Sequence, residues 1–370
     1  MDFYHNRRTQ LLRGGKTDDV DAYLVAHPAN VHYLTGLDLA EAVLVSAKGT
    51  FVVFPEDVVP PRKQLPPEVT PIPRADTTDP TAAAAEAVRA GGAKAVGVEA
   101  DHLSVAALDR LAEAVGKTTL RPLAGRVEDL RTTKDPSEAE AIKRALSVGG
   151  RAMLMFRAIL REVDTELELV RQMDQLLLRA GADAPAFPSV VALGDHAAAS
   201  VVRPATDPPV AEVSKLYVRW GAVVGGYCGT LARSFRSPFG APPLRKTKQE
   251  RTAFTYEKVS AAVREAMRAA VAATRAEATV GEVARAAHAQ LAAAGFDKYA
   301  AQEVGHGVGL DPREGPFLRP GDTTPLLQGM VLNITPQVRI PEWGMVKFSQ
   351  TVVVNREGTT DLGGSPANDD

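Results

Sequence analysis

The stretch 216–235, LYVRWGAVVGGYCGTLARSF, decides the fold. Its apolar, strand-like runs and internal glycines predict a hairpin of two long strands. Arg219 in the first run and Thr230 in the second are polar positions of this hairpin. Polar side chains within apolar strands are candidate functional residues, and Arg219 and Thr230 are two such side chains.

Helices and strand pairs alternate on both sides of the hairpin. Their hydrophobic periodicity predicts helices over 136–161, 165–180, 248–275 and 280–295, and strands over 187–193, 329–340 and 345–354. The order is helices, strand pair, helices, strand pair. This order predicts an α+β domain and indicates an internal duplication.

The N-terminal part follows a different pattern, with short strands between amphipathic helices. The strands are expected over 21–28, 42–54, 69–74 and 93–100, and the helices over 79–92 and 104–116. Asp79 or Thr81 and Ser104 are the expected N-caps. The pattern predicts a smaller α/β domain. Asp135-Pro136-Ser137 is typical of a helix start, so we expect domains over 1–133 and 134–370.

Composition excludes several classes of function. Of the 370 residues, 45% are hydrophobic and 24% charged, which is typical of a globular protein. The net charge of −2 predicts no general attraction to nucleic acid or to an anionic membrane. Cys228 is the only cysteine, which excludes intramolecular disulfides. With no signal peptide or membrane span evident, we expect a cytoplasmic protein.

Seven motifs together resemble those of the aminopeptidase P, prolidase and creatinase family, in order and in spacing. They cover almost the whole chain, so the set is specific although each motif alone is weak. The motifs are NVHYLTGL (30–37), TTKDPSEAEAIKRA (132–145), FPSVVALGDHAA (187–198), WGAVVGGYCGTLARSF (220–235), GHGVGLDPREGP (305–316), GMVLNITPQV (329–338) and GMVKFSQTVVV (344–354).

The resemblance implies a pita-bread C-terminal domain behind a creatinase-type N-terminal domain. Active members hold two divalent cations with two Asp, one His and two Glu. Here the two Asp positions fall at Arg219 and Thr230, and the histidine is retained as His306. The two Glu positions fall at Thr335 and Ser349. Four of the five ligands that the resemblance implies are therefore replaced.

The family's substrate-contacting and catalytic histidines are also replaced. The first falls at Val201, or at Ser200 one residue earlier, and the second falls at Arg313, while the neighbouring acid survives as Glu314. Four carboxylates would bring a charge of about −4, whereas the four replaced positions carry about +1. Because guanidinium groups repel metal cations, we expect no metal and no cofactor here.

The retained and exchanged residues allow two interpretations. His306 is more simply a structural residue of its glycine turn than a lone metal ligand. Arg219 either plugs the old site by pairing with Glu314 or Asp311, which we favour because an unpaired buried guanidinium is costly, or binds an anion in an open cleft. Arg313 is a second candidate for anion binding.

The hydroxyl groups at the exchanged positions are weak candidates for nucleophiles. Thr230, Thr335 and Ser349 have only His306 as a possible base, and no evident acid orients it, so a Ser or Thr hydrolase is disfavoured. Hydroxyls on adjacent strands also pair with one another across a sheet.

We therefore expect a pseudoenzyme: an Xaa-Pro peptidase homologue without dinuclear metal binding, with a peptide- or protein-binding role. Related inactive pita-bread domains act as binding modules, and the family implies a homodimer. The alternative is a metal-independent enzyme or anion-binding protein that uses Arg219, Arg313 and His306. Residual prolidase or aminopeptidase activity is a third, weaker interpretation.

Overall fold

The computed structural model describes residues 3–37, 39–199, 201–239 and 254–364. The chain separates into two compact units, Met1–Arg131 and Thr132–Asp370. In the part of the chain that is described, no helix is both long and apolar enough to cross a membrane.

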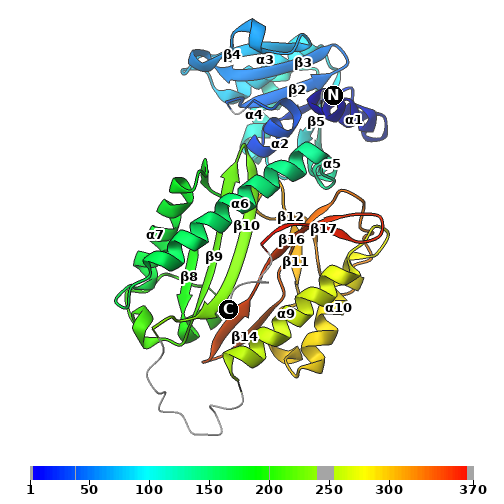
Figure 1. Cartoon of the computed structure of the whole chain (residues 1–370). Coiled ribbons are helices and arrows are strands. Elements are labelled where there is room, and N and C mark those ends of the chain that lie inside the picture. Colours follow the sequence, from blue (N-terminus) through cyan, green and yellow to red (C-terminus); the bar gives the residue numbers. More distant parts are fainter. Residues whose placement is uncertain (1–2, 38, 200, 240–253, 365–370) are drawn as a thin grey trace. The chain divides into compact units, whose positions relative to one another are not determined.

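The first unit is a six-stranded mixed sheet with helices packed on it (Figure 1). The strand order is β4-β3-β2-β1-β5-β6. The strands are β1 (Ala22–Val25), β2 (Ala42–Ser46), β3 (Gly49–Pro55), β4 (Val69–Arg74), β5 (Ala95–Glu99) and β6 (Thr119–Leu123). The helices are α1 (Phe3–Asp18), α2 (Pro28–Thr35), α3 (Pro80–Gly91), α4 (Val105–Val115) and α5 (Arg126–Arg131). Asp79 and Ser104 accept N-cap hydrogen bonds, as predicted.

The first unit departs from the sequence prediction in several places, and the elements α1, α2, β6 and α5 were not predicted. The single strand expected over 42–54 is instead a hairpin of β2 and β3, and the chain turns between the paired residues Ser46 and Gly49. Helix α1 was not predicted because it has few apolar residues. It is held by long-range contacts instead, since Arg7 and Arg8 donate to the carbonyls of Tyr33 and Leu34 at 3.0 and 2.8 Å.

The second unit begins with two helices and the predicted hairpin. Strands β9 and β10 pair antiparallel over their whole length, and β7 and β8 pair with β9. Helix α6 packs on both hairpin strands, and its capping box joins Asp135 with Glu138. The elements are α6 (Pro136–Ile159), α7 (Glu166–Arg179), β7 (Ala184–Pro185), β8 (Val190–Leu193), β9 (Lys215–Val224) and β10 (Tyr227–Arg236).

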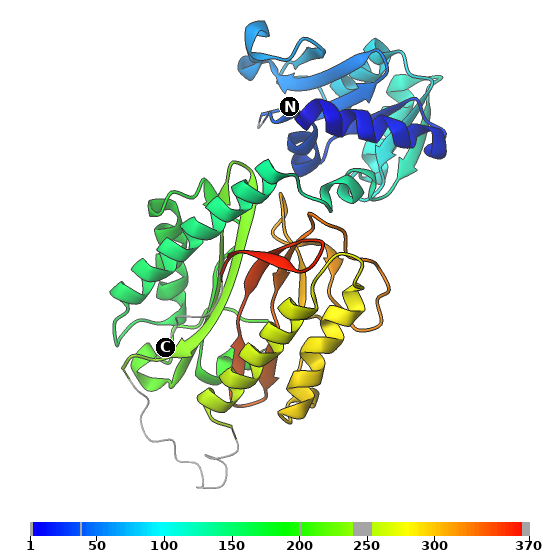
Figure 2. The same ribbon diagram turned by 45° about the vertical axis from the view of Figure 1, so that its right-hand side comes forward.

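The rest of the second unit repeats the order of helices followed by strands. Helices α9 (Tyr256–Ala273) and α10 (Val280–Ala293) pack against each other beside a five-stranded sheet, β12-β11-β13-β16-β17 (Figure 2). Of the predicted helix 248–275, residues 248–253 lie outside the described residues. The strands are β11 (Gly305–Gly307), β12 (Glu314–Phe317), β13 (Val331–Ile334), β14 (Gln337–Ile340), β15 (Gly344–Lys347), β16 (Gln350–Val354) and β17 (Thr359–Gly363).

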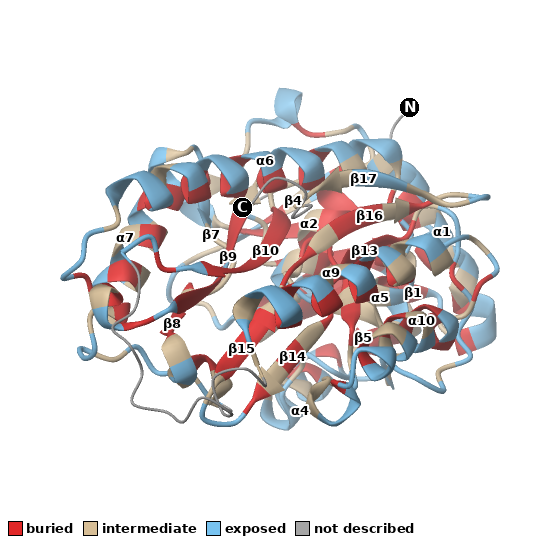
Figure 3. Cartoon of the chain, turned by 60° about the horizontal axis from the view of Figure 1, so that its bottom comes forward, coloured by how far each residue is buried: buried red, intermediate tan, exposed pale blue. Residues whose placement is uncertain are grey.

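The hydrophobic core of this C-terminal part lies between helices α9 and α10 and the strands beside them (Figure 3). Val263, Leu291 and Phe348 are fully buried in it. The two strands predicted over 329–340 and 345–354 are each broken in two, and β14 pairs with β15 as a separate ribbon. The breaks place Thr335 and Ser349 in short connections between strands.

Candidate functional site

A cavity of about 150 Å³ lies beside the β9–β10 hairpin in the second unit. Five of its lining residues are among the site positions predicted from the sequence, and the fold brings them together from separate segments of the chain. These five are Arg219, Thr230, His306, Arg313 and Thr335. Phe187, Asn333 and Lys347 also line the cavity and were not predicted.

Thr230 and Asn333 are joined across two sheets. The side-chain amide of Asn333 donates to Oγ1 of Thr230 at 2.6 Å, and both residues are buried. Asn333 and Thr335 are two positions apart, so they share one face of the chain, while Leu332 and Ile334 face the core. The positions implied for one Asp and one Glu are therefore occupied by the neutral side chains of Thr230, which is bound to Asn333, and Thr335.

Arg219 does not plug the cavity. Its side chain is exposed and lies over the ring of Phe187, with the guanidinium carbon 4.7 Å from the ring centre. The expected partner Glu314 is bound instead by Lys134. Among the described residues, no carboxylate forms an ion pair with Arg219. The plugged-site interpretation was wrong because Lys134 already neutralises the acid that Arg219 would need.

Arg313 has an acidic partner. Its Nη2 donates to both carboxylate oxygens of Glu303 at 2.7 Å, and Arg319 donates to the same carboxylate at 2.9 Å. The burial of Glu303 would raise its pKa, but hydrogen bonds from the two arginines outweigh this and hold the pKa below its usual value. Arg313 is therefore a weaker anion-binding candidate than the sequence indicated.

Lys347 is a cation at the cavity that the sequence analysis missed. Burial and the nearby Arg219 lower the pKa of Lys347 to about 8, although Glu303 opposes the shift. Arg219, Lys347 and the Glu303-bound Arg313 thus line the cavity, while no carboxylate among the described residues does. Lys347 stands two residues before Ser349, an implied ligand position, and this spacing is the one sequence signal for it. The orientation of the Lys347 side chain depends on the pairing of β14 with β15, which the sequence does not show.

His306 is neutral near pH 7. Burial lowers its pKa to about 4, and the hydrogen bond to Gly307 only partly opposes this. Its Nδ1 lies 2.9 Å from the carbonyl oxygen of Gly307. A carbonyl only accepts, so Nδ1 carries the proton and Nε2 is left as an acceptor. The structural role expected for His306 in its turn agrees with this hydrogen bond.

Three predicted positions do not line the cavity. Ser349 is fully buried, and its Oγ accepts a hydrogen bond from the backbone nitrogen of Ala232 at 2.8 Å. Val201 is 71% exposed, and the neighbouring Ser200 lies outside the described residues. Glu314 forms the ion pair with Lys134. Ser349 thus holds the hairpin to the last strands and is not available to a ligand.

The residues around the cavity do not fit a pair of divalent cations. Such a pair needs several anionic oxygen ligands, because these offset the charge of the metals. The described lining offers one imidazole, two hydroxyls, one amide and the cations Arg219, Arg313 and Lys347. The cations would repel a metal ion, and the amide is already bound to Thr230.

Comparisons with known proteins agree with the architecture. The model of metallopeptidase family M24 matches residues 140–356, and that of the creatinase/prolidase N-terminal domain matches residues 7–133. The Xaa-Pro dipeptidase of Pyrococcus horikoshii is 25% identical over 98% of both chains. That of Pyrococcus furiosus is 29% identical over 64% of both. The structure of an Xaa-Pro dipeptidase from Bacillus anthracis superposes with a TM-score of 0.86, at 22% identity over 98% of both chains. The fold is therefore the pita-bread fold with a creatinase-type N-terminal domain.

Proposed function

The chain belongs to metallopeptidase family M24, and we propose that it does not hydrolyse peptides with a dinuclear metal centre but binds an anionic ligand in the cavity between Arg219 and Lys347. The ligand class is a peptide that presents its C-terminal carboxylate. In this proposal the protein is a pseudoenzyme that keeps the scaffold of a peptidase.

The observation that carries this proposal is the excess of positive charge at the cavity. Arg219 and Lys347 line it without a described carboxylate, and Arg219 disfavours the charged form of Lys347. An anion between them would relieve this repulsion and accept charge-assisted hydrogen bonds from both groups. The guanidinium fork of Arg219 matches the two oxygens of a carboxylate.

The rest of the lining suits a small peptide. Phe187 provides an apolar wall that already supports the guanidinium of Arg219, and Thr335 adds a hydroxyl. The cavity has room for a group of several heavy atoms. Relatives are named Xaa-Pro dipeptidases, which favours dipeptides ending in proline as the first ligands to test.

A metal and activity assay tests the loss of hydrolysis. The purified protein, incubated with Mn²⁺ and then desalted, is analysed for bound metal and assayed with Xaa-Pro dipeptides. We expect no turnover above background and the same amount of bound metal in the wild type and in a His306→Ala variant. Metal-dependent turnover that disappears in a His306→Ala variant would overturn the proposal, because it would require a working centre at the retained histidine.

A binding titration tests the anion site directly. Calorimetry compares glycyl-proline with its C-terminal amide, which lacks the negative charge. We expect the amide, and also the Arg219→Gln variant, to bind at least about ten-fold more weakly, as expected for losing a charge-assisted hydrogen bond. The matched control is Arg319→Gln, an exposed arginine that does not line the cavity. Equal affinity for the acid and the amide would contradict the proposal.

A second candidate function is metal-independent catalysis in the same cavity. The observation that favours it is the neutral His306, whose Nε2 is an acceptor and a possible general base. A reaction product that forms without metal, and that disappears in His306→Ala while the affinity for glycyl-proline stays the same, would separate this function from simple binding.

A further inference from the structure

The first unit gathers a second group of reactive side chains at one edge of its sheet. Strands β1, β5 and β6 run parallel, so their carboxyl ends lie at the same edge. His27 follows β1, His102 follows β5, and Glu128 lies on α5 after β6. This edge of a parallel sheet is where ligands commonly bind in α/β domains.

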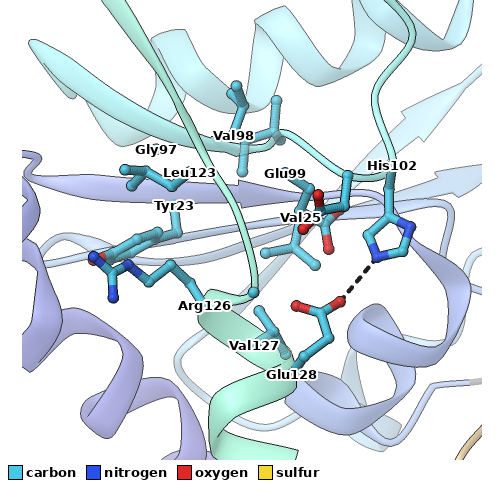
Figure 4. A pocket seen from close by; sticks show the side chains of 13 residues that line it. Tyr23, Val25, Gly97, Val98, Glu99, His102, Leu123, Arg126, Val127 and Glu128 are labelled. Carbon is cyan, nitrogen blue, oxygen red and sulfur yellow. Dashed lines mark hydrogen bonds and ion pairs between the residues drawn. The ribbon is translucent and has the colours of Figure 1, made fainter. Parts of the chain in front are cut away.

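The three side chains converge closely. One potential ligand atom from each of them lies within 4.8 Å of the other two. Nε2 of His102 lies 2.9 Å from Oε1 of Glu128. Figure 4 marks this contact with a dashed line. The rings of His27 and His102 are stacked, with centroids 3.8 Å apart and planes 20° apart.

The two histidines also border open space. A cavity of about 160 Å³ is lined by His27, His102 and Glu99 together with apolar residues. Glu99 and Asp101 line the smaller neighbouring pocket with His102 and Glu128, while its one arginine, Arg126, is bound to Asp18. The local charge is therefore negative, which favours a cation.

We propose that His27, His102 and Glu128 bind a single divalent transition-metal ion of the Zn²⁺ type. Two imidazole nitrogens and one carboxylate oxygen are a common donor set for such ions, and the fourth position is then occupied by water. His27 and His102 line the 160 Å³ cavity, so a small ligand that enters it can replace the water. This inference does not depend on the proposed function of the second unit.

Neighbouring residues hold two of the three ligands in place. Glu99 accepts hydrogen bonds from the backbone nitrogens of Ala26 and His27 at 2.7 and 2.9 Å, which fixes the chain at His27. Asn30 donates to both Glu99 and Glu128, at 2.7 and 2.6 Å. Such outer hydrogen bonds orient metal ligands and are part of the site.

Metal binding requires one local change. In a tetrahedral site with bonds of about 2.1 Å, the ligand atoms lie roughly 3.4 Å apart. The metal ion lies in the plane of each imidazole ring that binds it. Two stacked rings cannot both meet this condition, so one must turn. His102 is the ring that can turn, because it is exposed and follows the end of a strand.

Calorimetric titration of the full-length, chelator-treated protein with ZnCl₂ tests the site. We expect one ion per chain, and an affinity at least about ten-fold lower in His102→Ala and Glu128→Gln. Because His102 is exposed, its replacement leaves the fold intact, which circular dichroism verifies. Co²⁺ in place of Zn²⁺ is expected to show the intense visible absorption of a tetrahedral site in the wild type and not in His102→Ala.

Two histidine variants serve as controls. His5→Ala removes an exposed histidine of the same unit, and His306→Ala removes the histidine of the second unit. Both are expected to bind Zn²⁺ like the wild type. No Zn²⁺ binding, equal binding in His102→Ala, or loss of binding in His306→Ala would each overturn the inference.

Discussion

The pKa of Lys347 is lowered by its surroundings in the fold, and its sequence neighbours do not indicate this. It stands in an ordinary strand-like run, yet the fold buries part of its side chain beside Arg219. Burial and this second cation both disfavour the ammonium form, which lowers the pKa to about 8. The nearby Glu303 compensates only in part, because its oxygens bind Arg313 and Arg319.

The low pKa of Lys347 predicts a pH dependence of stability. The unfolded lysine has a pKa of 10.5, so the folded state disfavours the charged form by about 3 kcal/mol below pH 8. This cost disappears as the pH rises from about 8 to 10.5, because the folded protein then binds fewer protons than the unfolded chain. We expect Lys347→Met to raise the free energy of unfolding by up to about 3 kcal/mol near pH 7 and by little near pH 10.

Urea unfolding at the two pH values measures this effect. The control is Lys258→Met, which replaces an exposed lysine on α9 and is expected to change stability by less than about 0.5 kcal/mol at either pH. The same gain from Lys347→Met at both pH values would show that packing, and not the charge of Lys347, is responsible.

The hairpin and helix α6 form the contact that positions the cavity. Residues 229–231 of β10 run directly beneath α6, and Thr230 points from this segment into the cavity. Gly229 permits the close approach, since a Cβ there would lie 2.4 Å from the backbone nitrogen of Leu146 and 2.6 Å from the carbonyl carbon of Ala145. Backbone atoms cannot rotate away as a side chain can.

A Gly229→Ala substitution is therefore expected to destabilise the second unit by about 3 kcal/mol, because the helix must move away from the strand. Gly150→Ala is the matched control: this glycine lies on the same helix, and an added Cβ meets no atom within 4 Å. There the change is expected to stabilise by up to about 1 kcal/mol. Thermal and urea unfolding measure both, and equal effects would contradict the close approach.

The two units carry candidate sites of opposite charge. In the first unit, acidic residues and two histidines meet at the end of parallel strands. In the second, Arg219 and Lys347 line the cavity together with Arg313, which is bound to Glu303. If both proposals hold, the cation site and the anion site lie in different domains. The homodimer and the cytoplasmic location expected from the sequence stay predictions.

Hydrogen exchange measured by mass spectrometry checks this division of the molecule. Zn²⁺ is expected to slow exchange in peptides that contain the ends of β1 and β5 and helix α5. Glycyl-proline is expected to slow exchange around β9, β11 and β15 instead. Because the two sets of peptides differ, the failure of one proposal leaves the other measurable, and protection of the second unit by Zn²⁺ would contradict both.

The sequence by itself determined the order of the elements, the α+β class of the second unit, the long hairpin, the capped start of α6 and the absence of carboxylates at four implied ligand positions. These features follow from hydrophobic periodicity, from capping residues and from motif positions, all of which act over a few residues. It missed α1, whose position depends on contacts with residues 26 positions away.

Only the tertiary structure decided which charges meet. Glu314 is bound by Lys134, which is 180 positions away in the chain, and this left Arg219 to stack on Phe187 at an open cavity. The convergence of His27, His102 and Glu128 also requires three strands to end at one edge. Ion pairs and ligand clusters depend on distances of a few ångströms between remote segments, and local sequence patterns do not contain those distances.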